Sequence, residues 1–130
     1  MSGKDGKKIK IAVLLTCYNR KEQTLHCIES LAKHNSDVEL YFVITDDMST
    51  DGTAEALQNL PYRIKLIPGT GSLYWNGGMR QTISYALRNV GKFDYAMLIN
   101  DDVSFYPNVC RALLERMEEA KADVVVGSTE

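Results

Sequence analysis

Short apolar segments alternate with amphipathic segments along the chain, and this alternation constrains the fold more than any other feature. The apolar segments are near-continuous, as expected of strands covered on both faces, and lie at 10–15, 39–45, 63–67, 95–99 and 123–127. The amphipathic segments, which we expect to be helices, are 21–34, a short stretch ending at Leu60, about 76–90, and the segment after Pro107. This order predicts an α/β fold: a Rossmann-like, open, mostly parallel sheet with helices on both faces.

Residues at the segment ends support two of the helices. Ser49, Thr50 and Asp51 are typical N-caps, so we expect the short helix to follow them. Pro107 suits the first position of the last helix. Its core face would consist of Leu113, Leu114, Met117 and Ala120.

Length and composition bound the class of protein. We expect a flexible polar N-terminus over 1–8 and one domain over 9–130. A net charge of -2 without a Lys/Arg block argues against nucleic acid as a partner. The longest aliphatic run, IAVLL, is too short to span a bilayer. Three cysteines without CxxC spacing favour a reducing compartment, so we expect a cytoplasmic protein, with the full-length chain at the inner face of the membrane as an option.

Polar side chains follow three of the predicted strands at the points where they end. TCYNR (16–20) follows the first strand, the Asp pair 46–47 follows the second, and NDD (100–102) follows the fourth. Open parallel sheets bind ligands beyond the carboxyl ends of their strands. The three groups therefore predict a ligand site at one edge of the sheet.

The acidic residues at this edge have two readings. Asp and Asn are common turn formers, so Asp46 could simply stabilise the turn into STDGT, and Asp101 with Asp102 could begin another turn. Two such pairs at corresponding strand ends favour a metal instead. Oxygen ligands without His or thiolate indicate Mg²⁺ or Mn²⁺, which usually take further ligands from water and a phosphate-bearing substrate.

Other phosphate-binding folds do not fit the pattern. Gly69 and Gly71 lack the third glycine of a dinucleotide fingerprint and follow the third strand, and no GxxxxGK[ST] loop is present. We interpret these two glycines as a flexible loop. A bacterial receiver domain would need its acidic pair after the first strand, where this chain has TCYN.

Four stretches of the sequence together resemble a known family. IAVLLTCYNR, VITDDMSTDGT, GTGSLYWNGGMRQTISYAL and MLINDDVSF are similar, in order and spacing, to the N-terminal nucleotide-sugar-binding half of glycosyltransferase family 2 enzymes with the GT-A fold. The resemblance covers about residues 9–128. The GSLYW segment and the NDD motif resemble especially a rhamnosyltransferase-like subgroup.

The resemblance implies a role for each matching residue. It places the donor nucleotide against Thr16, Tyr18, Asn19 and Arg20. It implies that Asp46 or Asp47 accepts a hydrogen bond from the base, which a pyrimidine N3–H would donate. The implied contacts to the donor sugar and diphosphate are Asn76, Gly77 and Gly78, and Tyr74 and Trp75 would wall the pocket.

The NDD motif departs from the Asp-x-Asp pattern of the family. Asn100 stands at the first position, where the family residue usually contacts the ribose, and it brings no charge. The resemblance makes Asp102 the main ligand of Mn²⁺ or Mg²⁺, with Asp101 as a second ligand and neighbour of the donor. Asn100 would bind hydroxyl groups.

The resemblance also implies a reaction. A sugar would pass with inversion from a nucleoside-diphosphate sugar, of the UDP or dTDP type, to a glycan or lipid-linked acceptor in cell-surface glycan synthesis. The general base is expected downstream of Glu130, so we expect the acceptor half to be absent and this chain to be inactive alone. A homodimer through the uncovered flank near 123–127 is a further expectation. The alternative is a non-catalytic module that binds a nucleotide or nucleotide-sugar.

Overall fold

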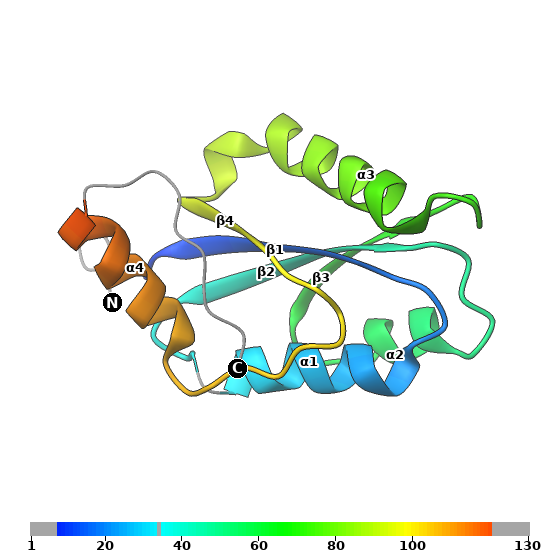
Figure 1. The fold of residues 1–130 in the computed structure, drawn as a ribbon, viewed down its shortest axis with the longest axis horizontal. Helices are drawn as coiled ribbons and strands as arrows, with labels where there is room; N and C mark the ends of the chain where they lie inside the picture. The colour runs from blue at the N-terminus through cyan, green and yellow to red at the C-terminus, as the bar shows by residue number, and fades with distance from the viewer. Residues whose placement is uncertain (1–7, 34, 121–130) are drawn as a thin grey trace.

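A four-stranded parallel sheet forms the centre of the computed structural model, which describes residues 8–33 and 35–120 (Figure 1). Its strands lie in the order β3-β2-β1-β4. Along the chain the elements are β1 (Lys10–Cys17), α1 (Lys21–Lys33), β2 (Glu39–Asp46), α2 (Thr53–Gln58), β3 (Arg63–Pro68), α3 (Tyr74–Arg88), the 3-10 helix η2 (Val90–Lys92), β4 (Tyr95–Leu98) and α4 (Val109–Ala120). The predicted α/β fold class is therefore confirmed.

The register of the sheet aligns the carboxyl ends of three strands. Cys17 at the end of β1 pairs with Asp46 of β2, and Asp46 pairs with Pro68 of β3. On the other side of β1, Leu14 pairs with Leu98, the last residue of β4. Because every pairing is parallel, the loops after all four strands leave the sheet at the same edge.

Helices cover both faces of the sheet, as predicted. One face packs against α1, α2 and α4 through a core that includes Val13, Leu15, Ile28, Leu57 and Leu114. The other face packs against α3 through Ala12, Leu14, Val43 and Met79. Figure 1 shows α3 alone on its side of the sheet and α1 with α2 on the opposite side.

A buried amide joins α1 to α4 on the larger core. Asn35 is fully buried and donates from Nδ2 to the carbonyl oxygen of Leu31 at 2.7 Å. Its Oδ1 accepts the backbone N–H of Cys110 at 2.9 Å, in the first turn of α4. The contact satisfies an N–H group that the helix cannot pair internally, and it fixes where α4 begins.

Several predicted boundaries are wrong, for local reasons. Pro107 does not open α4, because Asn108 with φ +62° intervenes and the helix begins at Val109. The N-cap residue of α2 is Gly52 and not Ser, Thr or Asp. Ala120 is exposed rather than part of the core face. The fifth strand, predicted at 123–127, lies outside the described residues.

The third helix begins two residues earlier than predicted, at Tyr74. The cause is the carboxylate of the residue that directly follows β2: Oδ2 of Asp47 accepts the backbone N–H groups of Leu73 and Tyr74. No helix within 8–33 or 35–120 has the length and apolar character needed to cross a bilayer.

Candidate functional site

The loops after β1 and β2 are joined by hydrogen bonds at the carboxyl edge of the sheet. Oδ1 of Asn19 accepts the backbone N–H of Thr50 at 2.7 Å, and the N–H of Asn19 donates to Oγ of Ser49 at 2.9 Å. Asn19 has φ +49°, a left-handed conformation that Asn tolerates better than most residues. Its Oδ1 therefore joins the two loops, whereas its Nδ2 donates no hydrogen bond to the described residues and is exposed at the edge.

Asp51 reinforces the same junction. Its Oδ2 accepts the N–H of Lys21, at the start of α1, at 3.0 Å. Its Oδ1 accepts from both the hydroxyl and the backbone N–H of Thr53 at the start of α2. The bond from the Thr53 hydroxyl is the main cause that lowers the pKa of Asp51. One carboxylate thus accepts backbone N–H groups at the start of two helices, although the N-cap position of α2 itself is Gly52. The sequence predicts a capping role for Asp51 at the short helix, and it gives no sign of the contact with Lys21, which lies 30 residues away in the chain.

Asp46 is buried at the end of β2, and one of its two carboxylate oxygens accepts hydrogen bonds within the turn that follows the strand. Its Oδ1 accepts from the hydroxyl of Ser49 and from the backbone N–H of Ser49 at 3.2 Å. The thiol of Cys17 points to the same oxygen from 3.9 Å. Oδ2 accepts no hydrogen bond from the described residues, so one oxygen of Asp46 is available to a ligand.

Asp47 is buried as well, and both of its oxygens are occupied. Oδ1 accepts the N–H of Gly71 at 2.7 Å, and Oδ2 accepts those of Leu73 at 2.9 Å and Tyr74 at 3.3 Å. The carboxylate also lies at the N-terminus of α3, where negative charge is stabilised. Asp47 therefore shapes the 69–74 loop, and its oxygens are engaged by backbone rather than by a base.

The sequence predicts only a flexible loop at Gly69, and the structure gives this residue a steric role. A Cβ atom there would lie 2.6 Å from Oδ1 of Asp47 and 2.8 Å from its Cα. Only glycine lets the loop pass this close to Asp47. Gly69 therefore permits a close approach of the backbone to Asp47, and Gly71 adopts φ +93°, a conformation that favours glycine.

Thr16 and Gly78, both predicted at the donor site, lie against each other. A Cβ atom on Gly78 would lie 2.8 Å from Cβ of Thr16, so the missing side chain lets α3 pack onto the end of β1. Oγ1 of Thr16 donates to the carbonyl oxygen of Thr45 at 3.1 Å. Both residues are buried, and their contact fixes the position of α3 relative to the carboxyl end of β1.

The two carboxylates of NDD face a cation from the first loop. Nη1 of Arg20 lies 3.5 Å from Oδ1 of Asp101 and 3.5 Å from Oδ2 of Asp102. The Asp101 side chain is only 12% exposed, whereas those of Arg20 and Asp102 are 52% and 54% exposed. Thr24 donates its hydroxyl to the other oxygen of Asp101 at 3.4 Å. Burial raises the pKa of Asp101, Arg20 opposes this, and Asp102 adds to it.

Asn100 and Trp75 link the fourth strand to α3. The indole Nε1 of Trp75 donates to Oδ1 of Asn100 at 3.2 Å. An indole N–H can only donate, so it fixes which end of the amide faces it and turns the donor Nδ2 away. Asn100 is exposed, so Nδ2 is available to acceptor oxygens such as those of a hydroxyl or phosphate.

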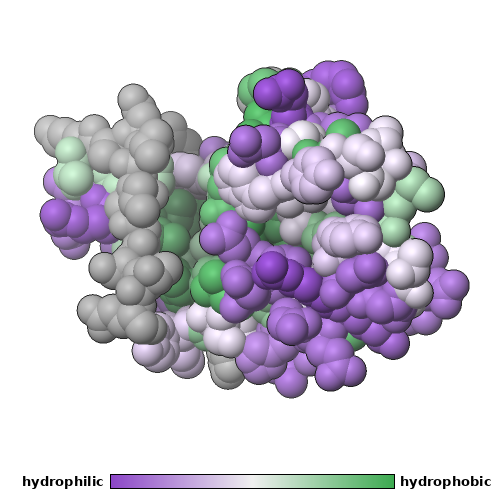
Figure 2. Space-filling model, turned by 45° about the vertical axis from the view of Figure 1, so that its right-hand side comes forward, coloured by the Kyte–Doolittle hydropathy of each residue, from purple (hydrophilic) through white to green (hydrophobic). Residues whose placement is uncertain are grey.

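The remaining predicted residues form an exposed rim around these groups. Tyr18 and Trp75 are more than half exposed, and Asn76 is exposed in the first turn of α3. Gly77 packs against Leu73, 3.0 Å from its Cβ if a side chain were added. Figure 2 turns this side of the molecule forward and shows mainly hydrophilic residues over its right-hand half.

The acidic pair fits a hard divalent cation in chemistry but supplies few ligands. Asp101 and Asp102 offer carboxylate oxygens on one short turn, with Arg20 between them. No group of three or more His, Cys, Asp or Glu residues in the described part of the chain could hold a metal. Water and phosphate oxygens would therefore have to complete the coordination, as is usual for Mg²⁺.

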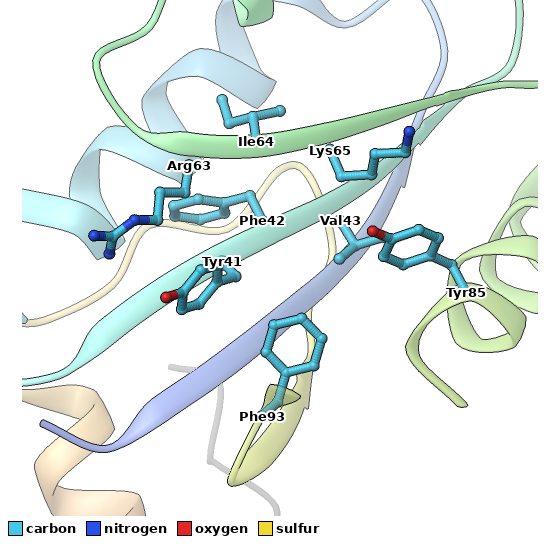
Figure 3. A pocket seen from close by; sticks show the side chains of 8 residues that line it. All are labelled: Tyr41, Phe42, Val43, Arg63, Ile64, Lys65, Tyr85 and Phe93. Atoms are coloured by element: carbon cyan, nitrogen blue, oxygen red, sulfur yellow. The ribbon is translucent and has the colours of Figure 1, made fainter. Parts of the chain in front are cut away.

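Two hollows lie on the α3 face, apart from the acidic pair. One, of about 270 Å³, is lined by Tyr41, Phe42, Val43, Arg63, Ile64, Lys65, Tyr85 and Phe93 (Figure 3). The other, of about 820 Å³, runs between β3 and α3 and includes Lys65, Arg80 and Arg88. In Figure 3 the aromatic rings of Tyr41 and Phe93 lie together, in edge-to-face contact. Neither hollow includes a carboxylate, so neither is the candidate metal site.

The parallel sheet with helices on both faces is an α/β domain of the GT-A kind, with acidic groups at the carboxyl edge of the sheet. The model of the family described as glycosyl transferase family 2 matches residues 12–130. The chain therefore belongs to glycosyl transferase family 2, which confirms the resemblance at the level of the family, whereas the rhamnosyltransferase-like subgroup stays a prediction.

Similar proteins support the same assignment. The glycosyltransferase GlyG of Streptococcus pneumoniae serotype 4 is 25% identical over 122 residues, which are 91% of this chain and 38% of GlyG. The structure of S. aureus TarS 1–349 superposes with a TM-score of 0.71 at 16% identity, covering 94% of this chain and 39% of TarS 1–349. The same TarS segment in complex with UDP gives a TM-score of 0.66 at 20% identity, covering 85% and 32%.

A third solved structure carries a metal. The mannosyltransferase PcManGT from Pyrobaculum calidifontis, in complex with GDP-Man and Mn²⁺, superposes with a TM-score of 0.61 at 16% identity, covering 85% of this chain and 32% of that one. At these identities the solved structures show a shared fold. The chain spans less than two fifths of the length of GlyG and of TarS 1–349.

Proposed function

We propose that this chain is the donor-binding domain of a metal-dependent, inverting glycosyltransferase that uses a nucleoside-diphosphate sugar. The observation that carries the proposal is the meeting of Arg20, Asn100, Asp101 and Asp102 at the edge where such folds bind nucleotides. Family membership and the UDP and GDP-Man complexes of similar folds support it.

The exposed residues of the edge are the ones proposed to contact the donor. Tyr18, Arg20 and Asn76 present exposed side chains, and Asn100 presents its amide Nδ2. Asp102, with Asp101, would hold Mn²⁺ or Mg²⁺. When bound, such a cation neutralises charge on the leaving diphosphate. Arg20 and Asn100 would bind and orient the donor through hydrogen bonds that their N–H groups donate to its oxygens.

Asp46 is the better of the two residues proposed to read the base. None of the described residues donates a hydrogen bond to its Oδ2, whereas both oxygens of Asp47 accept hydrogen bonds from backbone N–H groups. A free carboxylate oxygen can accept the N3–H of uracil or thymine. We therefore propose UDP- or dTDP-sugars as donors, in accord with the UDP complex of the similar TarS fold.

Transfer itself needs a group that deprotonates the acceptor. We propose that this base and the site for a glycan or lipid-linked acceptor belong to sequence beyond Glu130, because the chain matches only 38% of GlyG. Cell-surface glycan synthesis is the proposed setting. A non-catalytic nucleotide-binding module is the second candidate, and the Arg20 contact favours it in one respect, since the acidic pair is already neutralised in part without a metal.

The test uses the intrinsic fluorescence of Trp75, the only tryptophan of the chain. Because its indole contacts Asn100, ligands at the edge should change its emission. UDP or dTDP should titrate the signal in the presence of Mn²⁺, with ADP at least tenfold weaker, since a wrong base leaves a buried acceptor unpaired. Asp46→Asn should reduce that preference, and equal affinity for all three nucleotides would refute the base assignment.

Labelled nucleotide-sugars then separate the two candidate functions. The 130-residue chain should bind them but transfer no sugar, because a positioned general base contributes about 10²–10⁴-fold and orientation of the acceptor contributes more. A longer chain that includes the downstream sequence should transfer sugar to an acceptor. A longer chain that binds the donor and never transfers it would support the non-catalytic module.

A further inference from the structure

Arg20 lies between two carboxylates that are candidate metal ligands. Its Nη1 is 3.5 Å from Oδ1 of Asp101 and 3.5 Å from Oδ2 of Asp102, so a single nitrogen serves both residues. Within residues 8–33 and 35–120 no other Lys, Arg or His forms an ion pair with either carboxylate. Arg20 is therefore the counter-cation of the acidic pair in the absence of a metal.

The contact joins two loops that are far apart in the sequence and lie next to each other at the carboxyl edge of the sheet. Arg20 follows β1, whereas Asp101 and Asp102 follow β4, which lies next to β1. Asp101 is largely buried, and Thr24 donates to its second oxygen, so this carboxylate is held in place. The Arg20 side chain is 52% exposed, so it can leave the pair without breaking the core.

Charge decides what the pair can attract. Asp101 and Asp102 carry two negative charges, Asn100 adds none, and the guanidinium of Arg20 reduces the sum to one. A divalent cation from solution would have to come close to this guanidinium or displace it into water. A diphosphate offers the guanidinium another partner, because two of its oxygens can accept hydrogen bonds from two N–H groups of Arg20. The carboxylates are then left to bind the metal.

We propose that Arg20 is a specificity-determining residue that makes the acidic pair bind a divalent cation together with a nucleoside diphosphate in preference to the free cation. This inference rests on the proposed function, since it assumes that the edge binds metal and nucleotide. In the free protein Arg20 neutralises the pair. In the complex Arg20 contacts the diphosphate oxygens, and Asp102 with Asp101 contacts the metal.

The experiment measures two affinities for each variant: Mn²⁺ alone, by the loss of its free electron paramagnetic resonance signal, and UDP at saturating Mn²⁺, by calorimetry. The variants are Arg20→Gln, which removes the charge, and Arg20→Lys, which keeps it. Lys21→Gln is the matched control, because it removes the same charge one residue away without touching Asp101 or Asp102.

The expected signature is a change of opposite sign in the two affinities. Arg20→Gln should bind Mn²⁺ alone about tenfold more tightly, because an adjacent positive charge has been removed. The same variant should bind UDP with Mn²⁺ about tenfold more weakly, since a charge-assisted contact to phosphate is lost. Arg20→Lys should retain most of the wild-type discrimination against free Mn²⁺, and Lys21→Gln should change both affinities by less than about threefold.

Three outcomes would overturn the inference. Arg20→Gln could leave the affinity for free Mn²⁺ unchanged, it could shift both affinities in the same direction, or Lys21→Gln could produce the same shifts. Failure of the proposed function gives a different result, because then the wild-type chain binds no UDP with or without Mn²⁺. In that case the affinity of Arg20→Gln for free Mn²⁺ still tests whether Arg20 opposes the cation.

Discussion

The carboxylate of Asp47 accepts the backbone N–H of Gly71 at 2.7 Å, which ties the end of β2 to the loop before α3. Its second oxygen accepts the N–H groups of Leu73 and Tyr74. A buried anion thereby takes the place of the water that would otherwise satisfy these donors. The 69–74 loop is consequently held by Asp47, a residue that we expect no ligand to touch.

Replacing Asp47 by Ala should destabilise the domain by about 2–4 kcal/mol, because three backbone donors lose their acceptor and two of these belong to the start of α3. Urea denaturation measures the change. Asp47→Asn should cost less, since one acceptor oxygen remains. Asp102→Asn, at a half-exposed ion pair, is the control and should change stability by less than about 1 kcal/mol. An unchanged midpoint for Asp47→Ala would contradict the structural role.

Gly78→Ala should destabilise the domain by about 1–3 kcal/mol, because the added methyl group would overlap Thr16 where α3 meets β1. Gly91→Ala is the matched control, since a Cβ atom there meets no atom within 4 Å. Thermal denaturation of both variants compares them directly. Equal melting temperatures for the two would show that α3 can move away from β1 without cost.

Asp102→Ala should abolish Mn²⁺-dependent UDP binding and leave the fold intact, because Asp102 is half exposed and supplies the proposed main metal ligand. Calorimetry with Mn²⁺ and UDP measures binding, and circular dichroism checks the fold. Glu115→Ala removes an exposed carboxylate of α4 and serves as the control. If Asp102→Ala bound UDP with Mn²⁺ as tightly as the wild type, the main metal ligand would have to be another residue.

Asn100→Asp should strengthen Mn²⁺ binding by about tenfold, since it adds a third negative charge to the acidic pair while its oxygen can still accept from Trp75. Asn59→Asp makes the same change at the end of α2 and should leave the affinity unaltered. The measurement is direct titration of Mn²⁺. Weaker binding by Asn100→Asp would mean that the amide Nδ2, and not the charge, matters at this position.

The three cysteines should resist alkylation in the folded chain and should lower stability at high pH. Burial raises the pKa of Cys27 and Cys110 to about 12, and it raises that of Cys17 as well. The unfolded chain releases thiol protons above about pH 8.5, whereas the folded chain keeps them. Unfolding therefore becomes more favourable as pH rises from about 8.5, by up to about 1.4 kcal/mol per pH unit for each thiol.

Chemical denaturation at pH 7, 9 and 10 tests the pH dependence, and a thiol reagent added before and after denaturation tests access. A Cys17→Ser, Cys27→Ser, Cys110→Ser triple variant is the control, provided that it folds. Rapid labelling of the native chain at pH 7 would show that at least one thiol is accessible.

The alternation of apolar and amphipathic segments was sufficient to predict the fold class and the eight α-helices and β-strands within the described residues. It succeeds because burial on both faces of a strand, or on one face of a helix, leaves a local periodic trace in the sequence. The groups at 16–20, 46–47 and 100–102 could be assigned to one edge for a similar reason, since parallel strands must end on the same side. Boundaries such as Pro107 failed where the conformation of a single residue, Asn108, decided them.

What each of these residues does at the edge was decided only by the tertiary structure. Asp46 and Asp47 look equivalent in the sequence, yet one keeps a free oxygen and the other holds a loop that begins 22 residues later, at Gly69. Arg20 meets Asp101 across 81 positions of the chain because β4, and no other strand, lies beside β1 on that side. Strand order and register are set by the packing of the whole domain, and these set which side chains meet. Strand order and register cannot be predicted from local periodicity, because the periodicity depends only on residues that are close in the sequence.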